Sequence, residues 1–195
     1  MKQLTEQDYA KAAARLGCEV AAIKAVAAVE SRVSGFLVDG RPVILFERHI
    51  FRRQLVQNRV DPAPHERARP DIVNRRPGGY VGGAAEHERL ADAVAINRDA
   101  ALKSCSWGKF QIMGFNWRAT GHASLQDFVN AMYRDEAAQL DAFVAFLYAE
   151  GLDDELVRRD WAAFAERYNG PAYRKNRYDA KLATAYKRFA MRAAA

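Results

Sequence analysis

The chain has 195 residues, half of them apolar, and carries a formal net charge of +6 at neutral pH. This length and composition predict a single folded domain over residues 1–195 with its own core, and they exclude a fibrous or disordered chain. No segment reaches the roughly 18 uninterrupted apolar residues of a membrane span, and the N-terminus lacks the apolar stretch of a signal peptide. We therefore expect a protein that is made in the cytoplasm and does not insert stably into a membrane.

The positive charge predicts attraction to a polyanion, for which nucleic acid, a membrane surface and a bacterial cell wall are the candidates. The basic residues are spread along the chain, and their local pairs lie outside any recognisable nucleic-acid-binding motif. These pairs are Arg52-Arg53, Arg75-Arg76 and Arg158-Arg159. The pattern favours a diffuse positive surface and no nucleic-acid partner.

The two cysteines, Cys18 and Cys105, have neither the number nor the spacing of a disulfide framework or a metal site. We interpret both as small buried residues, with a single disulfide as the alternative. His49 also has no partner at metal-ligand spacing, so neither a metal nor a cofactor is expected.

Two helices are predicted at the start of the chain. Thr5 and Asp8 resemble a capping box, and Gly17 suits the position just after the last helical residue. The second helix, from about Glu19 to Glu30, is apolar on nearly every side. This pattern predicts the central and most buried helix of the fold.

Glu30 closes this apolar helix, and the residues that follow it no longer have a helical pattern. A carboxylate there lies near the negative end of the helix dipole and in apolar surroundings, and both raise its pKa. A raised carboxyl pKa is what a general acid needs at neutral pH. The alternative is a solvated glutamate at a helix end. Glu30 is thus a candidate catalytic acid.

The segment from Gly35 to Phe46 predicts a β-hairpin with Asp39-Gly40 at its turn. Pro42 is expected at the turn or at the edge, where its missing N–H does no harm. No other segment has a comparable strand pattern. The sequence therefore predicts a mainly α (α+β) fold with one small β-hairpin after the central buried helix.

The rest of the chain is predicted to be helical or loop. Further helices are expected at His49–Gln57, Glu86–Leu102, Leu125–Glu150 with one break, Trp161–Arg167 and Tyr178–Met191. Between Asp61 and Gly83, four prolines and two glycine pairs exclude a long helix and predict a loop. A loop of this length in a compact domain is typical of a mobile or functional segment.

Three segments, in this chain order, resemble those of goose-type lysozymes and lytic transglycosylases. Glu30-Ser31 matches the Glu-Ser pair that carries the catalytic acid in that superfamily, and Ser104–Gly114 resembles its Ser-x-x-Gly-x-Met-Gln-Ile stretch. Tyr168–Pro171 resembles its Tyr-Asn-x-Gly segment. Together with Ile44–Phe51 and Tyr178–Leu182, they make the chain similar to the N-acetylmuramidase domain of phage endolysins, from about residue 18 to residue 188.

The resemblance implies a lysozyme-like domain that cuts the β-1,4 bond between N-acetylmuramic acid and N-acetylglucosamine in bacterial peptidoglycan. In that superfamily the sugar binds between the helical lobe and the hairpin lobe, and Glu30 would donate the proton. Ser106, Gln111, Tyr168 and Asn169 would hold the sugar and its acetamido group.

An endolysin of this type would stay in the host cytoplasm until its release to the cell wall, and we expect a monomer. The small peptidoglycan-binding module that often precedes such a domain has no counterpart in this sequence.

Several of these residues also have a purely structural interpretation. Gly108 and Gly114 could permit tight turns, Tyr168 could be a core residue with its hydroxyl bonded, and Asn169 could be a helix C-cap. Tyr80, between two glycine pairs, could stack on a sugar ring or lie in a surface loop without a role. Phe110 and Ile112 are expected in the core.

The second carboxylate is less well defined. Glu47, at the end of the second predicted strand, would face the cleft if the strand alternates as expected, or it could be a salt-bridged structural residue beside Arg48. Asp39 is the rival, but Asp-Gly is a strong turn signal. Some glycosidases use one carboxylate only.

Three alternatives to a hydrolase that acts as a phage endolysin remain open on the sequence. A lytic transglycosylase needs only Glu30 and yields a 1,6-anhydro product. An antibacterial effector would use the same domain against competing cells. A non-enzymatic basic binding domain would keep its function when Glu30 is replaced by glutamine.

Overall fold

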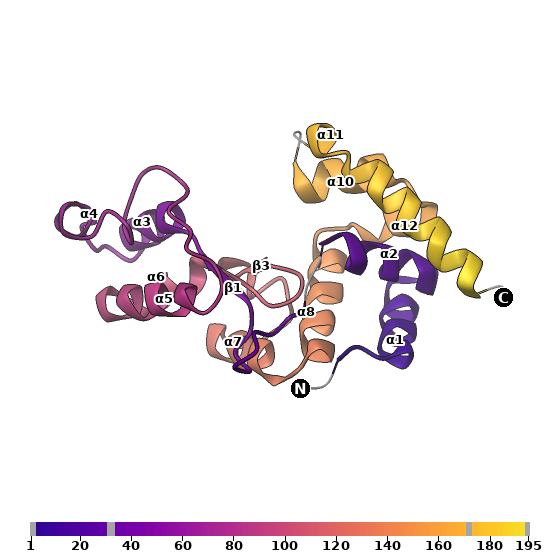
Figure 1. Ribbon diagram of the computed structural model, residues 1–195, viewed down its shortest axis with the longest axis horizontal. Helices are drawn as coiled ribbons and strands as arrows, with labels where there is room; N and C mark the ends of the chain where they lie inside the picture. Colours follow the sequence, from indigo (N-terminus) through magenta and orange to yellow (C-terminus); the bar gives the residue numbers. More distant parts are fainter. Residues whose placement is uncertain (1–2, 31–33, 171–172, 194–195) are drawn as a thin grey trace.

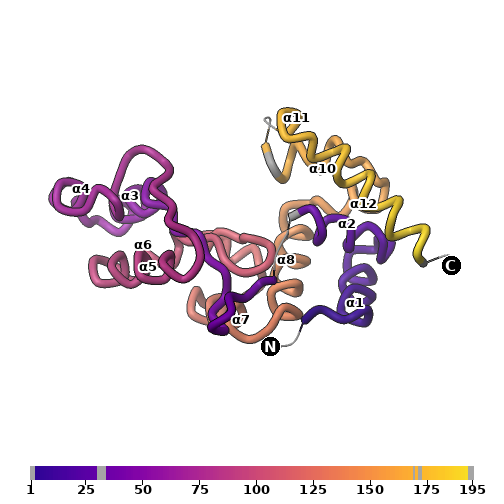
Figure 2. The backbone as a smooth tube through the Cα atoms, in the orientation of Figure 1, coloured from indigo at the N-terminus to yellow at the C-terminus, as the bar shows by residue number. Residues whose placement is uncertain are grey.

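The computed structural model describes residues 3–30, 34–170 and 173–193, and within these ranges the chain is mostly helical (Figures 1 and 2). The helices are α1 (Glu6–Leu16), α2 (Val20–Glu30), α3 (Arg48–Gln57), α4 (Ala63–Ala68), α5 (Ala85–Ile96), α6 (Arg98–Lys103), α7 (Leu125–Arg134), α8 (Glu136–Ala149), α9 (Asp153–Arg158), α10 (Trp161–Asn169), α11 (Tyr173–Asn176) and α12 (Tyr178–Ala193). The strands are β1 (Ile44–Phe46), β2 (Cys105–Trp107) and β3 (Ile112–Met113), and a 3₁₀ turn covers Gly114–Asn116. The mainly helical fold class is confirmed.

Figure 1 shows the elements on two sides of the molecule. Helices α3 to α6 lie on one side, and α1, α2 and α10 to α12 on the other, with the small sheet, α7 and α8 between them. None of the helices in the described ranges is both long and apolar enough to cross a membrane.

The two N-terminal helices follow the sequence prediction. The Thr5 hydroxyl accepts a hydrogen bond from the Asp8 N–H, and the Asp8 carboxylate accepts one from the Thr5 N–H at 2.9 Å, which forms the capping box. Gly17 ends α1 in the left-handed conformation, with φ of 67°. Helix α2 packs against α12 and α1, and both Ile23 and Val26 are completely buried.

The sheet differs from the predicted hairpin. The Asp39-Gly40 turn is present, and the Leu37 N–H donates to the Arg41 carbonyl at 2.8 Å, but only one bridge, Phe36 to Pro42, joins its two arms. Strand β1 instead pairs with β2, and β2 with β3, in an antiparallel order β1-β2-β3. Strands of two or three residues are too short for an alternating pattern to mark them in the sequence.

Asparagine and aspartate side chains set two of the helix boundaries. The predicted helix Glu86–Leu102 is interrupted at Asn97, whose side chain accepts from the Ala100 N–H at 2.9 Å and caps α6. The expected break in Leu125–Glu150 lies at Asp135, whose carboxylate accepts from the Ala138 N–H at 2.7 Å. Helices α4, α9 and α11, of four to six residues, were not predicted.

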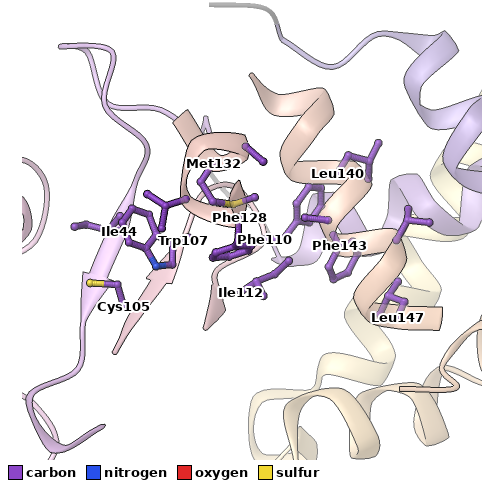
Figure 3. Close-up of a cluster of buried hydrophobic side chains, with 14 of the residues drawn as sticks. Ile44, Cys105, Trp107, Phe110, Ile112, Phe128, Met132, Leu140, Phe143 and Leu147 are labelled. Atoms are coloured by element: carbon purple, nitrogen blue, oxygen red, sulfur yellow. The ribbon is translucent and has the colours of Figure 1, made fainter. Parts of the chain in front are cut away.

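A continuous core joins the sheet to the helices on both sides (Figure 3). The Phe110 and Phe143 rings stack at 4.4 Å between centroids with an interplanar angle of 5°, which fixes the β2–β3 turn against α8. Phe110 and Ile112 are buried, as expected from the sequence, and Trp107 is buried as well. The sheet thus has one face in the core and one face available to a site.

The cysteines are both free, so the alternative of a disulfide is wrong. Cys105 is completely buried, whereas Cys18 is only partly buried and so departs from the prediction. Burial raises the pKa of the Cys18 thiol to about 11, which keeps it protonated and poorly reactive at neutral pH.

Candidate active site

The first part of the candidate site is the C-terminal end of α2. The helix ends at Glu30 and is buried along the residues before it, including Ala25, Val26 and Ala27. The Glu30 side chain and residues 31–33 lie outside the described part of the chain. The backbone therefore places Glu30 where the sequence predicted it, at the negative end of the central helix.

The chain that follows α2 is held by a carboxylate from another helix. Glu136, the first residue of α8, accepts hydrogen bonds from the Gly35 N–H at 2.8 Å and from the Leu4 N–H at 3.3 Å. Its carboxylate also lies 3.3 Å from the Lys109 ammonium. Burial raises the pKa of Glu136, but these donors more than offset it and leave the pKa below its usual range. Glu136 thus fixes the position at which the chain leaves the α2 region.

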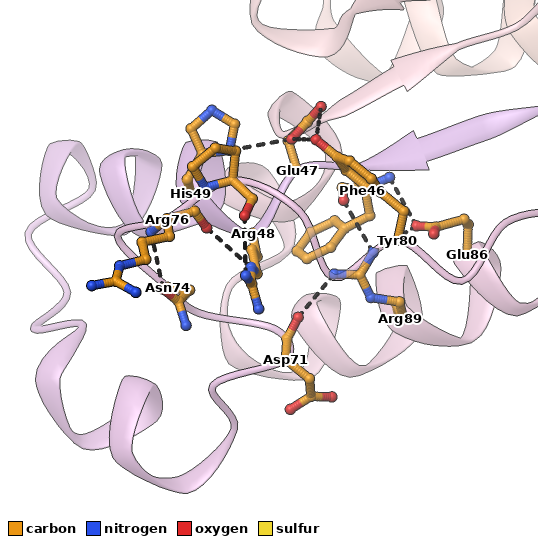
Figure 4. Close-up of polar contacts among 11 residues, drawn as sticks. Phe46, Glu47, Arg48, His49, Asp71, Asn74, Arg76, Tyr80, Glu86 and Arg89 are labelled. Atoms are coloured by element: carbon orange, nitrogen blue, oxygen red, sulfur yellow. Dashed lines mark hydrogen bonds and ion pairs between the residues drawn. The ribbon is translucent and has the colours of Figure 1, made fainter.

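The second carboxylate of interest, Glu47, lies directly after β1 at the N-cap of α3 (Figure 4). Its N–H donates to the Ser104 carbonyl at 3.0 Å, which extends the β1–β2 pairing by one residue. The Tyr80 hydroxyl is 3.0 Å from one Glu47 oxygen and 2.9 Å from the other. Only 16% of the Glu47 side chain is exposed, so this residue is a partly buried carboxylate with a specific partner.

Two neighbours complete the surroundings of Glu47. The Nδ1 atom of His49 is 3.2 Å from a Glu47 oxygen, although it is not aligned for a hydrogen bond. Burial, followed by the bond to Glu47, raises the pKa of Tyr80, so its hydroxyl stays protonated and donates. The Arg48 guanidinium binds backbone carbonyls and not Glu47. The contact with His49 keeps a structural role of Glu47 as an alternative.

Arg48 anchors the predicted loop (Figure 4). Its guanidinium donates to three backbone carbonyls, those of Pro70 at 3.2 Å, Arg76 at 3.0 Å and Pro77 at 3.0 Å. The segment therefore has a defined path that ends beside Glu47, and it contains the short helix α4. Its motion during a reaction stays a prediction.

A buried ion pair holds the far end of this loop. The Glu86 carboxylate is completely buried and accepts from the N–H groups of Val81 at 2.8 Å and Gly82 at 3.0 Å. It also accepts from the Phe46 N–H at 3.1 Å and pairs with Arg89 at 2.8 Å. Burial raises the pKa of Glu86, but the backbone donors and Arg89 outweigh it and lower the pKa overall. One carboxylate thus connects β1 to the residues that follow Tyr80.

The second group of predicted residues lies around the β2–β3 turn. The Ser106 hydroxyl donates to the Gln111 carbonyl oxygen at 2.6 Å, and the Gln111 amide donates to the Gly108 carbonyl at 2.8 Å. Gln111 has a left-handed backbone, with φ of 50°, which is uncommon for a residue with a side chain. Ser106 is buried, so it acts on the site through the orientation of Gln111.

This turn needs a glycine at each of two positions. A Cβ atom at Gly108, where φ is 68°, would lie 2.6 Å from the buried Gln139 side chain. At Gly114 it would lie 2.1 Å from the Leu102 carbonyl. The turn interpretation is confirmed for Gly108, whereas Gly114 is needed because the Leu102 backbone approaches it closely. The resemblance motif is therefore partly a packing requirement.

Tyr168 joins this turn to α10. Its ring stacks on Phe164 at 5.6 Å and meets the Phe143 ring edge-on, while its hydroxyl is 3.5 Å from the Phe110 carbonyl. It is half-buried, which combines a core ring with a hydroxyl near Gln111. The Asn169 side chain lies outside the described part of the chain, although its backbone ends α10.

The sheet register relates the residues of the β2–β3 turn to the pair formed by Glu47 and Tyr80. Leu45 pairs with Ser106, and Ser106 with Met113, so these side chains share one face. Glu47 follows Leu45 by two residues and belongs to the same face. Ser106, Gln111 and Tyr168 are thus connected through the turn, and Glu47 with Tyr80 lies farther along the same sheet face.

The rival carboxylate, Asp39, is used by its own turn. Its oxygens accept from the Arg41 N–H at 3.0 Å and from the Arg41 guanidinium at 2.9 and 2.6 Å. These bonds lower the pKa of Asp39, which is the reverse of what a general acid needs. Within the described ranges, no group of three or more His, Cys, Asp or Glu side chains could hold a metal ion.

Sequence reasoning missed Glu86, Glu136 and Arg48, which position the site. Glu86 and Arg89 are three residues apart on one helix, a spacing that indicates an ion pair but does not reveal its burial. Glu136 binds residues about 100 positions away, and no local pattern marks such a contact.

Comparison with known proteins identifies the family of the chain. The N-acetylmuramidase family model matches residues 19–190. The endolysin of Enterobacteria phage PRD1 is 32% identical over 112 residues, which are 53% of this chain and 74% of that protein. The crystal structure of Burkholderia AP3 phage endolysin superposes with a TM-score of 0.91 at 48% identity, over 97% of this chain and 72% of that one. The chain belongs to the N-acetylmuramidase family and is a glycoside hydrolase of peptidoglycan.

Proposed function

We propose that the chain hydrolyses the β-1,4 bond from N-acetylmuramic acid to N-acetylglucosamine with Glu30 as its general acid. The observation that carries this proposal is the position of Glu30 at the end of the buried helix α2. A proton on this carboxyl would be favoured by its place at the negative end of the helix dipole. Farther along the chain, the Gly35 N–H donates to Glu136.

In this mechanism the Glu30 proton passes to the glycosidic oxygen while the bond from that oxygen to C1 of the muramic acid breaks. The N-acetylglucosamine leaves as an alcohol, and positive charge develops at C1. Glu47 stabilises this charge or orients the water that attacks C1. The water loses its proton to a carboxylate and completes a reducing muramic acid end.

Five residues are proposed to hold the substrate. Gln111 and Asn169 offer amides to the acetamido group, and Ser106 orients Gln111 through its 2.6 Å hydrogen bond. The Tyr168 hydroxyl is proposed to lie near the reacting sugar. Tyr80, 46% exposed, offers its ring to a sugar while its hydroxyl binds Glu47.

The biological role proposed is that of a phage endolysin, because the two relatives described above carry that name. Such a protein acts on the cell wall of the host after its release. The proposal includes a monomer and no requirement for nucleic acid or for insertion into a membrane.

A lytic transglycosylase is the alternative that would keep the same fold and the same acid. A lytic transglycosylase needs Glu30 alone and closes a 1,6-anhydro ring without water.

Mass spectrometry of digested muropeptides distinguishes the two reactions. Digestion in water enriched in oxygen-18 is expected to place the heavy oxygen at C1 of muramic acid. Products that are lighter by one water and carry no label would show that the reaction is transglycosylation and not hydrolysis. Labelled reducing ends on N-acetylglucosamine would reject both.

A further inference from the structure

A groove of about 470 Å³ lies between the C-terminal half of α2 and the helix α12. Figure 1 shows α12 crossing α2. It is lined by Ala28, Val29, Arg177, Ala180, Lys181, Thr184, Ala185 and Arg188. Val29 immediately precedes Glu30, so the groove reaches the end of the helix that carries the proposed acid. Its floor is small and apolar, and its rim is basic.

The described part of the chain offers no counter-charge to the basic residues of the groove. Among the residues that the structure describes, Arg177, Lys181 and Arg188 make no ion pair, and no carboxylate lines the groove. By contrast, Arg159 and Arg167 nearby bind Glu19 at 3.0 Å and Glu155 at 2.6 Å. Three like charges on one side of a groove repel one another, and an anion relieves this repulsion.

The basic side chains are also restrained on the surface. The Lys181 ammonium lies 5.2 Å from the centre of the Tyr178 ring, and the Arg188 guanidinium lies 4.7 Å from that of Phe189. Arg177 has a left-handed backbone, with φ of 53°, at the single residue between α11 and α12. A glycine would adopt this conformation more easily than arginine does.

We propose that this groove binds the carboxylates of the peptide stem attached to muramic acid. The inference rests on the proposed function, since Glu30 would act on the bond beside that sugar. The stem branches from the muramic acid ring and carries several carboxylates, which match the three unpaired cations in charge. The groove would then select cross-linked or peptide-bearing strands over bare glycan.

The test compares two soluble substrates, sonicated peptidoglycan with intact stems and the same strands after an amidase has removed the stems. Stripping leaves one carboxylate at the lactyl group of the sugar and removes those farther from the ring. The variant is the double substitution Lys181→Gln and Arg188→Gln. The matched control removes the same charge from exposed, unpaired positions on α3 and α4, by Arg53→Gln and Arg67→Gln.

The double groove variant should lose about five-fold or more in kcat/KM on the intact strands, mainly through KM, as expected for two partly exposed charge contacts. On stripped strands its loss should stay below about two-fold, and the control should match the wild type on both substrates. Equal losses on both substrates, equal losses in the control, or no loss at all would overturn the inference.

Three further outcomes separate this inference from others. If the groove variant loses activity only on whole cells and not on purified strands, the groove binds lipid phosphates and the stem assignment is wrong. If the wild type cleaves neither substrate, the proposed function itself fails. If the wild type cleaves both substrates and the groove variant has the same ratio of kcat/KM between them, only the stem assignment fails.

Discussion

At the scale of single residues, Glu47 shows how a carboxylate can be prepared for a role in catalysis. It lies at a strand end and is mostly buried, and both of its oxygens are within hydrogen-bond distance of the Tyr80 hydroxyl. A hydroxyl that donates to a carboxylate fixes its orientation. An oriented carboxylate is suited to stabilise positive charge at C1 or to hold a water.

We expect Glu47→Gln to lower kcat by about ten-fold or more while KM stays within about two-fold, because the charge would act only in the transition state. Steady-state kinetics on soluble peptidoglycan measures this split. Tyr80→Phe keeps the ring but frees Glu47, so it should lose part of kcat and little binding. An unchanged rate in Glu47→Gln would leave an enzyme with a single catalytic carboxylate and favour the transglycosylase.

At the scale of secondary-structure elements, α5 anchors two other segments through one side chain. Glu86 binds the Phe46 N–H at the end of β1 and the Val81 and Gly82 N–H groups of the loop. It therefore sets the distance between Glu47 and Tyr80, although its position on a helix suggested no such role.

Glu86→Gln should destabilise the protein by about 3 kcal/mol, because it leaves Arg89 buried without its counter-charge. Urea unfolding should show a lower midpoint with an unchanged slope. Glu88→Gln, an exposed position on the same helix, is the matched control and should leave the midpoint in place. A stable Glu86→Gln protein would show that the ion pair contributes little to the fold.

The lowered pKa values of Glu86 and Glu136 predict how stability depends on pH. A carboxyl whose folded pKa lies below its unfolded value of about 4.3 binds fewer protons when folded. Its contribution is present above that unfolded pKa and is lost as pH falls through the folded pKa. The melting temperature should therefore drop below about pH 4, and Glu86→Gln should reduce this dependence. A profile of equal steepness in the variant would contradict the assignment.

The sequence predicted long elements well and short ones poorly. Helix α2 was recognisable because eleven residues in a row carry one pattern, and the break at Asp135 was expected within a long helical stretch. Strands β2 and β3 were missed because two or three residues carry no periodicity. The resemblance motif Ser104–Gly114 pointed to the right segment, but not to its place in the sheet beside β1.

The candidate site was predictable where the residues have a local signal. Glu30 ends an apolar helix, and Asp39 sits in a turn sequence, so both positions could be interpreted directly. The contacts of Tyr80 with Glu47 and of Glu136 with Gly35 join distant parts of the chain, and only the fold reveals them.

At the scale of the whole molecule, the chain carries a formal net charge of +6. Salt screens the attraction between this charge and an anionic cell wall. At physiological ionic strength the attraction weakens beyond a Debye length of about 8 Å. The proposed sugar site acts on a neutral glycosidic bond, so its chemistry should depend little on salt.

We expect lysis of whole cell walls to fall steeply between low and high salt, while cleavage of short soluble fragments changes much less. Both rates are measured over one salt series at constant pH. Equal salt dependence for the two substrates would mean that the charge acts on catalysis or folding and would reject a role in targeting.

The central claim, that Glu30 is the general acid of a muramidase, is tested most directly by Glu30→Gln. The release of reducing ends from purified peptidoglycan should fall by about a hundred-fold or more, with an unchanged melting temperature, because glutamine keeps the shape of the side chain but cannot supply the proton. Glu166→Gln, at an exposed position on α10, is the matched control and should keep full activity. A folded Glu30→Gln protein that retains most of its activity would contradict the proposed mechanism.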